Sequence, residues 1–367
     1  MTTQHTDHYR DPDLSRRLAD RINSASRTPV RLMEVCGTHT VSIFRHGIRH
    51  LLPDSVQLIS GPGCPVCVTS QQDIDTFIAY AREDGVIVAT FGDLLRVPGT
   101  GSSLQKERAN GRDVRIVYST FDAVQLAREN PDRRVVFLGV GFETTAPTVA
   151  AAIWSAKQDG VQNFMVASAH KTVPPALEAL TASEDIQVDG FLLPGHVSVI
   201  IGTDGYTEFF DRHRIPCVVA GFEPVDLLLA ISMAVEQIES GSPALENAYP
   251  RGVSAKGNPK ALQMMNTVFE PADAIWRGIG VIPGSNLTIR DPFGDWDAAR
   301  RIPVEVPAAK DPAGCACGDI LKGIKIPPEC RLYRQACTPM NPVGPCMVSS
   351  EGTCAAFYRF HREDPRP

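Results

Sequence analysis

Ten cysteines divide into groups that lie far apart in the chain. Six stand within the last 53 residues, whereas three others lie upstream in loops rich in glycine, threonine and proline. The upstream three are Cys36, Cys64 and Cys67, the six are Cys315, Cys317, Cys330, Cys337, Cys346 and Cys354, and the tenth is Cys217. Cys217 begins a run typical of a buried strand, where a packing role is expected. Two separate thiol groups indicate two sites with different tasks.

The C-terminal cysteines are numerous enough to hold a metal centre. A [4Fe–4S] cluster and a structural zinc ion each take four thiolates, so six cysteines leave two over. Zinc sites usually bring paired C-x2-4-C knuckles, whereas 6 residues separate Cys330 from Cys337 and 16 separate Cys337 from Cys354. This spacing favours a cluster held from separate loops, with the surplus pair as a redox dithiol. A zinc-stapled tail with two inert thiols is the alternative.

Cys36 and His39 form a candidate site near the N-terminus. They stand in the segment CGTHT, directly after an apolar run expected to be a strand. Ligands of open α/β sheets bind beyond the carboxyl ends of the strands, so both side chains are expected at an active edge. A thiolate and an imidazole at this spacing are able to share one metal ion. Alternatively, His39 accepts a proton and lowers the pKa of Cys36.

Cys64 and Cys67 form a C-P-V-C version of the C-x-x-C redox motif. A helix that starts near residues 68–72 would place both thiols at its positive terminus, which favours the thiolate. The sequence therefore predicts a redox-active dithiol. A zinc knuckle is the alternative, with Cys36 and His39 as the further ligands at hand.

Polar side chains also follow several other expected strands. If the two halves of the chain face each other, these residues line one cleft, although each alone also suits a helix cap or a loop. They are Asp93, Glu143, His170, His196 and Glu223.

Short apolar runs, each followed by a helix-like segment, are expected to position these residues. Their alternation with helical segments predicts an α/β fold with parallel sheets whose strands are buried on both faces. The runs cover residues 31–35, 56–60, 86–91, 115–119, 135–140, 164–168, 190–195 and 217–222.

The runs divide into two similar sets. Cys36 in VCGTHT matches Gly141 in VGFETT at an offset of 105 residues, and Phe121 in FDAVQL matches Phe222 in FEPVDL at an offset of 101. Such a repeat predicts two similar open parallel-sheet domains that face a cleft. The general similarity of βα units is the alternative explanation of the match.

The repeat also suggests domain boundaries. We expect a first α/β domain at residues 30–132, a second at 133–250, and an iron–sulfur domain formed by 251–367 together with 1–29. A chain of 367 residues suits two or three domains. The sequence after residue 250 is rich in proline and glycine, which oppose long helices and central strands. This last domain is therefore expected to be loop-rich.

Composition excludes several function classes. A net charge of −6 without a basic run argues against nucleic-acid binding. No apolar stretch reaches the ~20 residues that span a bilayer, and the N-terminus lacks the apolar core of a secretory signal, so we expect a cytoplasmic protein without membrane contact. In that reducing compartment the cysteines are expected to serve metals or redox chemistry. Walker, G-x-G-x-x-G and G-x-S-x-G motifs do not occur in the sequence.

Several segments together resemble one protein family. They are MEVCGTHT, GPGCPVCVT, GFETTAPTVA, SAHKTVPPAL, DGFLLPGHVSVIIG, GFEPVDLL, CGDILKG, PPEC and CTPMNPVGPCMVSSEGTCAAFY. They are similar to the HypD family of [NiFe]-hydrogenase maturation factors. The resemblance implies a scaffold on which the Fe(CN)2CO unit of the hydrogenase active site is assembled. The implied partners are the chaperone HypC, through it the hydrogenase large subunit, and HypE with HypF upstream, which deliver cyanide.

The resemblance also implies roles for individual residues. Cys36 would ligate the iron jointly with the N-terminal cysteine of HypC, with His39 beside it, and Cys64 and Cys67 would form the redox dithiol. The family pattern C-x14-C-x6-C-x16-C assigns a [4Fe–4S] cluster to Cys315, Cys330, Cys337 and Cys354 and leaves Cys317 and Cys346 as a second thiol pair, similar to ferredoxin:thioredoxin reductase. We hypothesise that electrons pass from the cluster through this pair to Cys64 and Cys67, which requires the tail to fold back onto the first domain.

Two other functions fit parts of the pattern. A stand-alone [4Fe–4S] thiol/disulfide oxidoreductase uses the cluster and the C-P-V-C dithiol but gives no role to Cys36 and His39. A zinc-stapled binding module would be colourless and without acid-labile sulfide.

Overall fold

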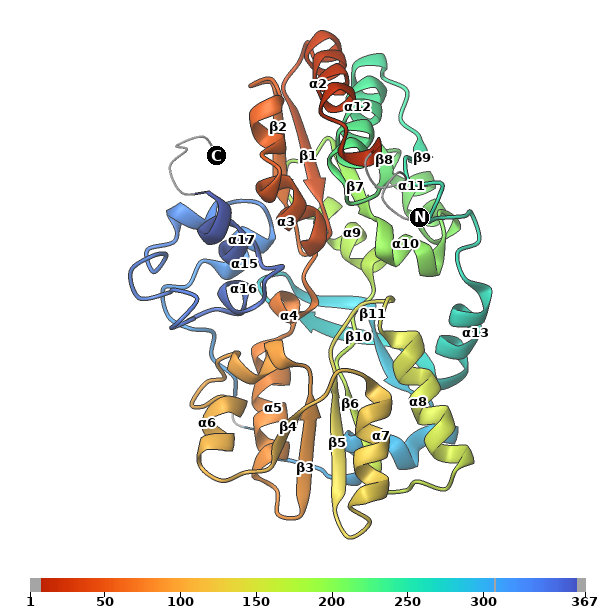
Figure 1. Ribbon diagram of the computed structural model, residues 1–367, viewed down its shortest axis with the longest axis vertical. Coiled ribbons are helices and arrows are strands. Elements are labelled where there is room, and N and C mark those ends of the chain that lie inside the picture. The colour runs from red at the N-terminus through yellow and green to blue at the C-terminus, as the bar shows by residue number, and fades with distance from the viewer. Residues whose placement is uncertain (1–7, 307, 362–367) are drawn as a thin grey trace.

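The computed structural model describes residues 8–306 and 308–361 (Figure 1). Two parallel β-sheets lie one above the other in Figure 1, each flanked by helices, and a cysteine-rich module lies beside them. The predicted α/β fold with two similar parallel sheets and a cysteine-rich C-terminal region is therefore confirmed. In the part of the chain that the structure describes, no helix combines the length and the apolar character needed to cross a membrane.

The upper sheet of Figure 1 has the strand order β2-β1-β7-β8-β9. Helices α2, α3 and α12 cover it, and α2 packs along α12. The strands are β1 (Val30–Glu34), β2 (Val56–Ser60), β7 (Gly190–Pro194), β8 (Cys217–Ala220) and β9 (Leu245–Asn247). The helices around them are η1 (His8–Arg10), α2 (Pro12–Ala25), α3 (Gly37–Arg45), η2 (Ile48–Leu51), α9 (Val173–Thr181), α10 (Gly195–Ile201), η4 (Asp204–Tyr206), α11 (Thr207–His213) and α12 (Pro224–Ser240).

The lower sheet has the order β4-β3-β5-β6. Its strands are β3 (Val86–Thr90), β4 (Val114–Ile116), β5 (Arg134–Gly139) and β6 (Phe164–Ser168). The helices around it are α5 (Gln71–Arg82), η3 (Gly92–Arg96), α6 (Leu104–Ala109), α7 (Thr120–Glu129), α8 (Ala146–Gln158), η5 (Asp291–Trp296) and α14 (Ala298–Arg301). The short α4 (Pro65–Val68) lies between the two sheets.

Each predicted apolar run overlaps a strand. Strands β3 and β7 are buried along their whole length, as expected for parallel strands covered by helices on both faces. The run at 115–119 is the least regular, because β4 ends at Ile116 and the chain turns into the Ser119 N-cap of α7. Cys217 begins β8 and is fully buried among apolar side chains, as predicted.

The two halves of the chain exchange strand pairs. The upper sheet joins β1 and β2 from the first half to β7 and β8 from the second, and the lower sheet joins β5 and β6 to β3 and β4. When each strand is replaced by its counterpart in the other half, the order β2-β1-β7-β8 becomes β6-β5-β3-β4, so the two sheets share one topology. A division at residue 132 therefore does not separate them, because each sheet takes strands from both expected ranges.

The region after residue 250 holds more regular structure than its composition predicts. Helix α13 (Pro259–Val268) leads into a hairpin of β10 (Phe269–Trp276) and β11 (Gly280–Ile289), the longest strands described. Pro271 and Pro283 are tolerated because a two-stranded ribbon leaves one edge of each strand without a ladder. Helix α13 packs against α8 of the lower sheet, and the N-terminal α2 belongs to the upper sheet. The loop-rich module is thus shorter than expected.

The cysteine-rich module contains only short helices: α15 (Cys317–Leu321), η6 (Pro327–Glu329), α16 (Pro345–Val348) and α17 (Thr353–Phe360). It packs on the sheets through α17 against α3 and through α16 against α4. Its apolar side chains Ile320, Met347 and Phe357 belong to one core cluster with Met33 and Ile59 of the upper sheet. The module therefore folds onto the first quarter of the chain, as the relay hypothesis requires.

Candidate redox and metal site

Cys36 stands at the turn between β1 and α3, where it is the N-cap residue of the helix. The loop that carries Cys64 packs directly on this turn, because the amide of Gly37 donates to the carbonyl of Gly63 at 2.9 Å. A Cβ at Gly63 would lie 2.2 Å from the backbone nitrogen of Cys36. Glycine at position 63 thus permits the two thiol-bearing loops to touch.

A buried carboxyl group supports the Cys36 turn. Glu34, the last residue of β1, accepts hydrogen bonds at Oε1 from Ser60 at 2.6 Å and from Thr40 at 3.2 Å. Burial raises the pKa of Glu34 to about 7, although the charge of Arg49 opposes this shift. Glu34 therefore ties β1 and β2 to the helix that follows Cys36. Sequence reasoning missed it, since a glutamate ending a strand usually faces solvent.

His39 is fully buried below the same turn. Its Nε2 lies 3.2 Å from the carbonyl of Ala220, which only accepts, so Nε2 carries the proton. Burial lowers the pKa of His39 to about 4, so the ring is neutral at pH 7. Nδ1 then presents a lone pair that has no hydrogen-bond partner among the residues described.

Cys64 and Cys67 occupy the first turn of α4. Cys64 is the N-cap, and its sulfur accepts a hydrogen bond from the amide of Cys67 at 3.3 Å. The side chains are 4% and 0% exposed, respectively. The dithiol is therefore closed to bulk solvent.

Buried sulfur atoms continue from this dithiol into the cysteine-rich module. Cys67 shares a side-chain hydrogen bond with Cys346. The sulfur of Cys346 lies 2.7 Å from that of Cys317, and Cys317 in turn shares a hydrogen bond with Cys315. Five thiols of the two sequence groups thus form one continuous chain from Cys64 to Cys315.

Cys315, Cys330, Cys337 and Cys354 converge at the far end of this chain. The charges of Cys315, Cys337 and Cys330 each raise the pKa of Cys354, which burial raises most. Backbone amides point at two of the sulfurs, from Ala316 to Cys330 at 3.5 Å and from Val343 to Cys337 at 3.3 Å. Converging thiols with amide donors fit a [4Fe–4S] cluster. Within the residues described, no three His, Cys, Asp or Glu side chains are grouped so that they could hold a single metal ion.

Burial prevents the thiol activation that the sequence predicts. The pKa of Cys36 is raised to about 12 by desolvation, which outweighs the amide donors of His39 and Thr38. Desolvation also raises the pKa of Cys67 well above its usual value. The side chain of His39 is bound to Ala220, and α4 spans only four residues. Burial therefore outweighs the lowering of these pKa values that the sequence predicts from His39 and from the helix terminus.

Glu351 connects the cysteine-rich module to the Cys36 turn. Its Oε1 accepts a hydrogen bond from Thr38 at 2.7 Å. Burial raises the pKa of Cys36 and the charge of Glu351 adds to this shift, whereas burial lowers the pKa of His196 and the charge of Glu351 opposes that shift. The two residues are more than three hundred positions apart in the sequence, so no local sequence pattern predicts this contact.

Arg277 joins the dithiol segment to the cluster end. Its guanidinium is buried and donates to the carbonyl of Thr69 at 3.0 Å, to Gln71 at 2.9 Å and to Asp311 at 2.8 Å. Its positive charge lowers the pKa of Cys315, although a hydrogen bond with Cys317 and burial raise that pKa more. Sequence reasoning missed this residue too, because its partners come from distant segments.

The predicted cleft residues separate into two groups. Glu143 and His170 are buried in the segments that follow β5 and β6 of the lower sheet. Glu143 accepts from the amide of Val173 at 2.8 Å. The hydroxyl of Ser168 donates its one hydrogen to the carbonyl of Leu287. Nδ1 of His170 lies 3.0 Å from the same oxygen and is therefore the donor of that hydrogen bond. Burial raises the pKa of Glu143 to about 7 and lowers that of His170 to about 3. Both lie inside the protein rather than on a cleft wall.

The other predicted cleft residues lie nearer the surface. His196 is exposed and stacks on Phe222 with ring centroids 3.8 Å apart, and Phe222 also contacts the ring of His39. Glu223 instead accepts two hydrogen bonds from Arg10, at 2.6 and 2.8 Å, which lower its pKa. Asp93 accepts from Ser349 at 3.3 Å. Of this group, His196 is the one that the structure joins to His39.

Gly63→Ala is expected to reduce the free energy of unfolding by about 3 kcal/mol, because the added methyl group meets the backbone of Cys36. Anaerobic urea unfolding measures the change. Gly101→Ala is the matched control, since a Cβ there meets no atom within 4 Å. Equal stability of the two variants would contradict the close contact of the two loops.

Glu143→Gln is expected to become more stable than the unaltered protein as pH rises. The pKa of Glu143 is about 7 in the fold, because burial raises it, and 4.5 in the unfolded chain. The folded protein therefore binds this proton more tightly than the unfolded chain does, and the free energy of unfolding falls as pH rises from 4.5 to about 7. The difference should grow by about 3 kcal/mol between pH 4.5 and 8. Thermal unfolding midpoints at several pH values test this. Glu184→Gln, at an exposed site, should show no such trend; parallel trends for the two variants would refute the assignment.

Comparison with known proteins gives the chain its relatives. A family model described as "HypD: Hydrogenase formation hypA family" matches residues 13–361. The chain is 46% identical to the hydrogenase maturation factor HypD of Azotobacter vinelandii, over 98% of the chain and 97% of the relative. It is 44% identical to the HypD factor of Escherichia coli K12, over 98% of each protein, and 43% identical to that of Cupriavidus necator, over 98% and 97%. The chain therefore belongs to the HypD family of hydrogenase maturation factors.

Proposed function

We propose that this protein is the scaffold on which the Fe(CN)2CO moiety of [NiFe]-hydrogenase is assembled, together with a HypC-type chaperone and with cyanide received through HypE. The observation that carries the proposal is the continuous chain of thiols from Cys64 to Cys315, with the Cys36 turn packed against its inner end. A metal-ligand candidate and a path for electrons thus meet at one place.

Cys36 is the protein's ligand for the iron cargo. Burial raises the pKa of its thiol to about 12, and a bound cation reverses this preference by stabilising the thiolate. The unpartnered Nδ1 of His39 is a buried proton acceptor close in sequence to that thiol. Soft thiolate suits an iron centre that carries cyanide and carbon monoxide.

Cys315, Cys330, Cys337 and Cys354 hold the resident [4Fe–4S] cluster, which when bound supplies single electrons. The protein's own thiols handle these electrons in pairs. A Cys317–Cys346 disulfide that gains two electrons and two protons becomes two thiols. The Cys346 thiolate then attacks a Cys64–Cys67 disulfide at its Cys67 neighbour and releases Cys64. Cys317 resolves the resulting Cys67–Cys346 bond, which restores the outer disulfide and leaves a reduced inner dithiol.

Burial argues against a stand-alone oxidoreductase for protein disulfides. Thiol/disulfide exchange requires sulfur atoms to meet. Cys67, Cys317 and Cys346 are 0%, 5% and 1% exposed, so a folded partner has no access to them. A dry thiol chain fits an internal electron path and leaves the Cys36 turn as the place where the electrons are used.

Cys346→Ser is expected to keep the cluster but to stop reduction of the inner dithiol. After anaerobic reduction with dithionite, alkylation and mass spectrometry should find Cys64 and Cys67 still oxidised in the variant and labelled in the unaltered protein. The variant should have the same iron content, acid-labile sulfide content and visible absorption as the unaltered protein. The control variant Cys217→Ala removes a buried thiol that is not part of the row from Cys64 to Cys315. Its Cys64 and Cys67 should be labelled as in the unaltered protein. Normal labelling and normal hydrogenase maturation by Cys346→Ser would refute the relay.

Cys36→Ala is expected to abolish iron-cargo binding without loss of the cluster. Protein purified anaerobically with a HypC-type chaperone should show cyanide and carbonyl stretches in the infrared, and the variant should show none. The visible spectrum of the cluster serves as the internal control. Unchanged infrared bands in the variant would favour the oxidoreductase function instead.

A further inference from the structure

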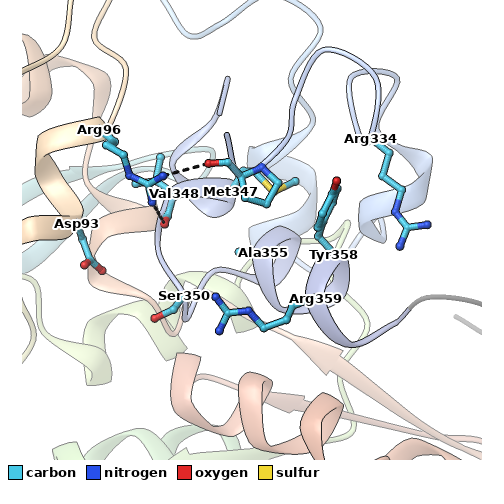
Figure 2. A pocket seen from close by; sticks show the side chains of 10 residues that line it. Asp93, Arg96, Arg334, Met347, Val348, Ser350, Ala355, Tyr358 and Arg359 are labelled. Carbon is cyan, nitrogen blue, oxygen red and sulfur yellow. Dashed lines mark hydrogen bonds between the residues drawn. The ribbon is translucent and has the colours of Figure 1, made fainter. Parts of the chain in front are cut away.

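A groove of about 820 Å³ lies on the cysteine-rich module, between that module and η3 of the lower sheet (Figure 2). Its lining includes the residues directly after Cys346 and Cys354. Both cysteines and Cys337 are buried just beneath, at 1%, 8% and 7% exposure. The groove is therefore an outer surface of the module that holds the cluster ligands and the second thiol pair.

The groove is basic although the protein is acidic. Arg96, Arg334 and Arg359 line it and are exposed, and among the residues that the structure describes Asp93 is the one carboxylate in its lining. The chain as a whole carries a net charge of −6. In residues 8–306 and 308–361, none of these three arginines forms an ion pair with a carboxylate. Their charges are thus available to an anionic partner.

Two of the arginines are held in place by the protein. Arg96 donates to the carbonyls of Pro339 and Val348, at 3.0 and 3.4 Å, which fixes it across the groove (Figure 2). Arg334 donates to a backbone carbonyl at 3.1 Å and lies over the ring of Tyr358. Arg359 extends towards Ser350 in Figure 2. Pre-ordered guanidinium groups lose less entropy when they bind a carboxylate.

We propose that this groove docks an acidic electron-carrier protein, which supplies the electrons for the thiol relay. The inference rests on the proposed function, because a relay that starts at the cluster needs a one-electron donor from outside. Two reduced carriers each lose one electron, and the Cys317–Cys346 disulfide gains both together with two protons. The groove suits such a donor because an electron can pass through protein to a buried group, whereas disulfide exchange would need direct access to the buried sulfurs.

The shape and charge of the groove select this occupant. Its volume of about 820 Å³ far exceeds that of a single phosphate ion, and its arginines come from three separate segments. Carboxylates spread over a protein surface match such a distribution and are steered to it over long range.

Binding of oxidised plant-type [2Fe–2S] ferredoxin, an acidic carrier, tests the proposal by calorimetry at low ionic strength. The double variant Arg334→Glu, Arg359→Glu should bind at least ten-fold more weakly than the unaltered protein. The matched control is Arg17→Glu, Arg27→Glu, which makes the same charge change at exposed sites in and beside α2; its affinity should change less than two-fold. Stopped-flow oxidation of the reduced ferredoxin should show the same ranking, and Arg359→Glu alone should give an intermediate loss.

Equal affinities of the groove and control variants would overturn the proposal. So would displacement of ferredoxin by phosphate at constant ionic strength, which would make the groove a small-anion site. Dithionite reduces the cluster without docking, so reduction of Cys64 and Cys67 by dithionite should persist in the groove variant. If dithionite does not reduce Cys64 and Cys67 in the unaltered protein, the relay is wrong. This outcome is distinct from a failure of ferredoxin to dock.

Discussion

The side-chain contact between Cys67 and Cys346 is the interaction on which the arrangement of the site depends. It joins α4, which lies between the sheets, to α16 of the cysteine-rich module. On one side the Cys64 loop rests on the Cys36 turn, and on the other Cys346 reaches Cys317 and the cluster ligands. Without this contact the two groups of cysteines would be separate sites. The Cys36 turn and its dithiol would then lack a path to the cluster ligands.

The same contact places these thiols where their charged forms are disfavoured. Burial is the largest cause that raises the pKa values of Cys36 and Cys67. The pKa values of Cys317 and Cys346 are raised by their hydrogen bonds with Cys346 and Cys67, respectively, and by burial, which together outweigh the hydrogen bonds with Cys315 and Cys317 that lower them. Neutral buried thiols are poor nucleophiles and poor ligands until a metal or a disulfide neighbour changes the balance.

Sequence patterns predict the local units of this fold well and their partners poorly. Buried parallel strands need continuous apolar runs, and each run found in the sequence overlaps a strand. The exchange of strand pairs escapes such reasoning, because β1 and β5 carry similar patterns and either neighbour would satisfy them. The β10–β11 hairpin was missed since its prolines and glycines look like loop residues. Glu34, Glu351 and Arg277 act through contacts across the chain, which no spacing rule records.

The exchanged topology also determines where chemistry is possible. Because β1 and β2 belong to one sheet and β3 to the other, the chain must cross between the sheets directly after β2, and Cys64 and Cys67 lie on that crossing. A second crossing follows β6 and carries His170. A change in the relative position of the sheets would therefore act on the segment that holds the dithiol, while Cys36 stays with the upper sheet. Glu351 and Arg277 fasten the Cys36 turn and the dithiol segment to the cysteine-rich module. These contacts fix the crossing on both sides. The thiols of Cys64 and Cys67 therefore keep their positions although they lie on a connection rather than on a strand.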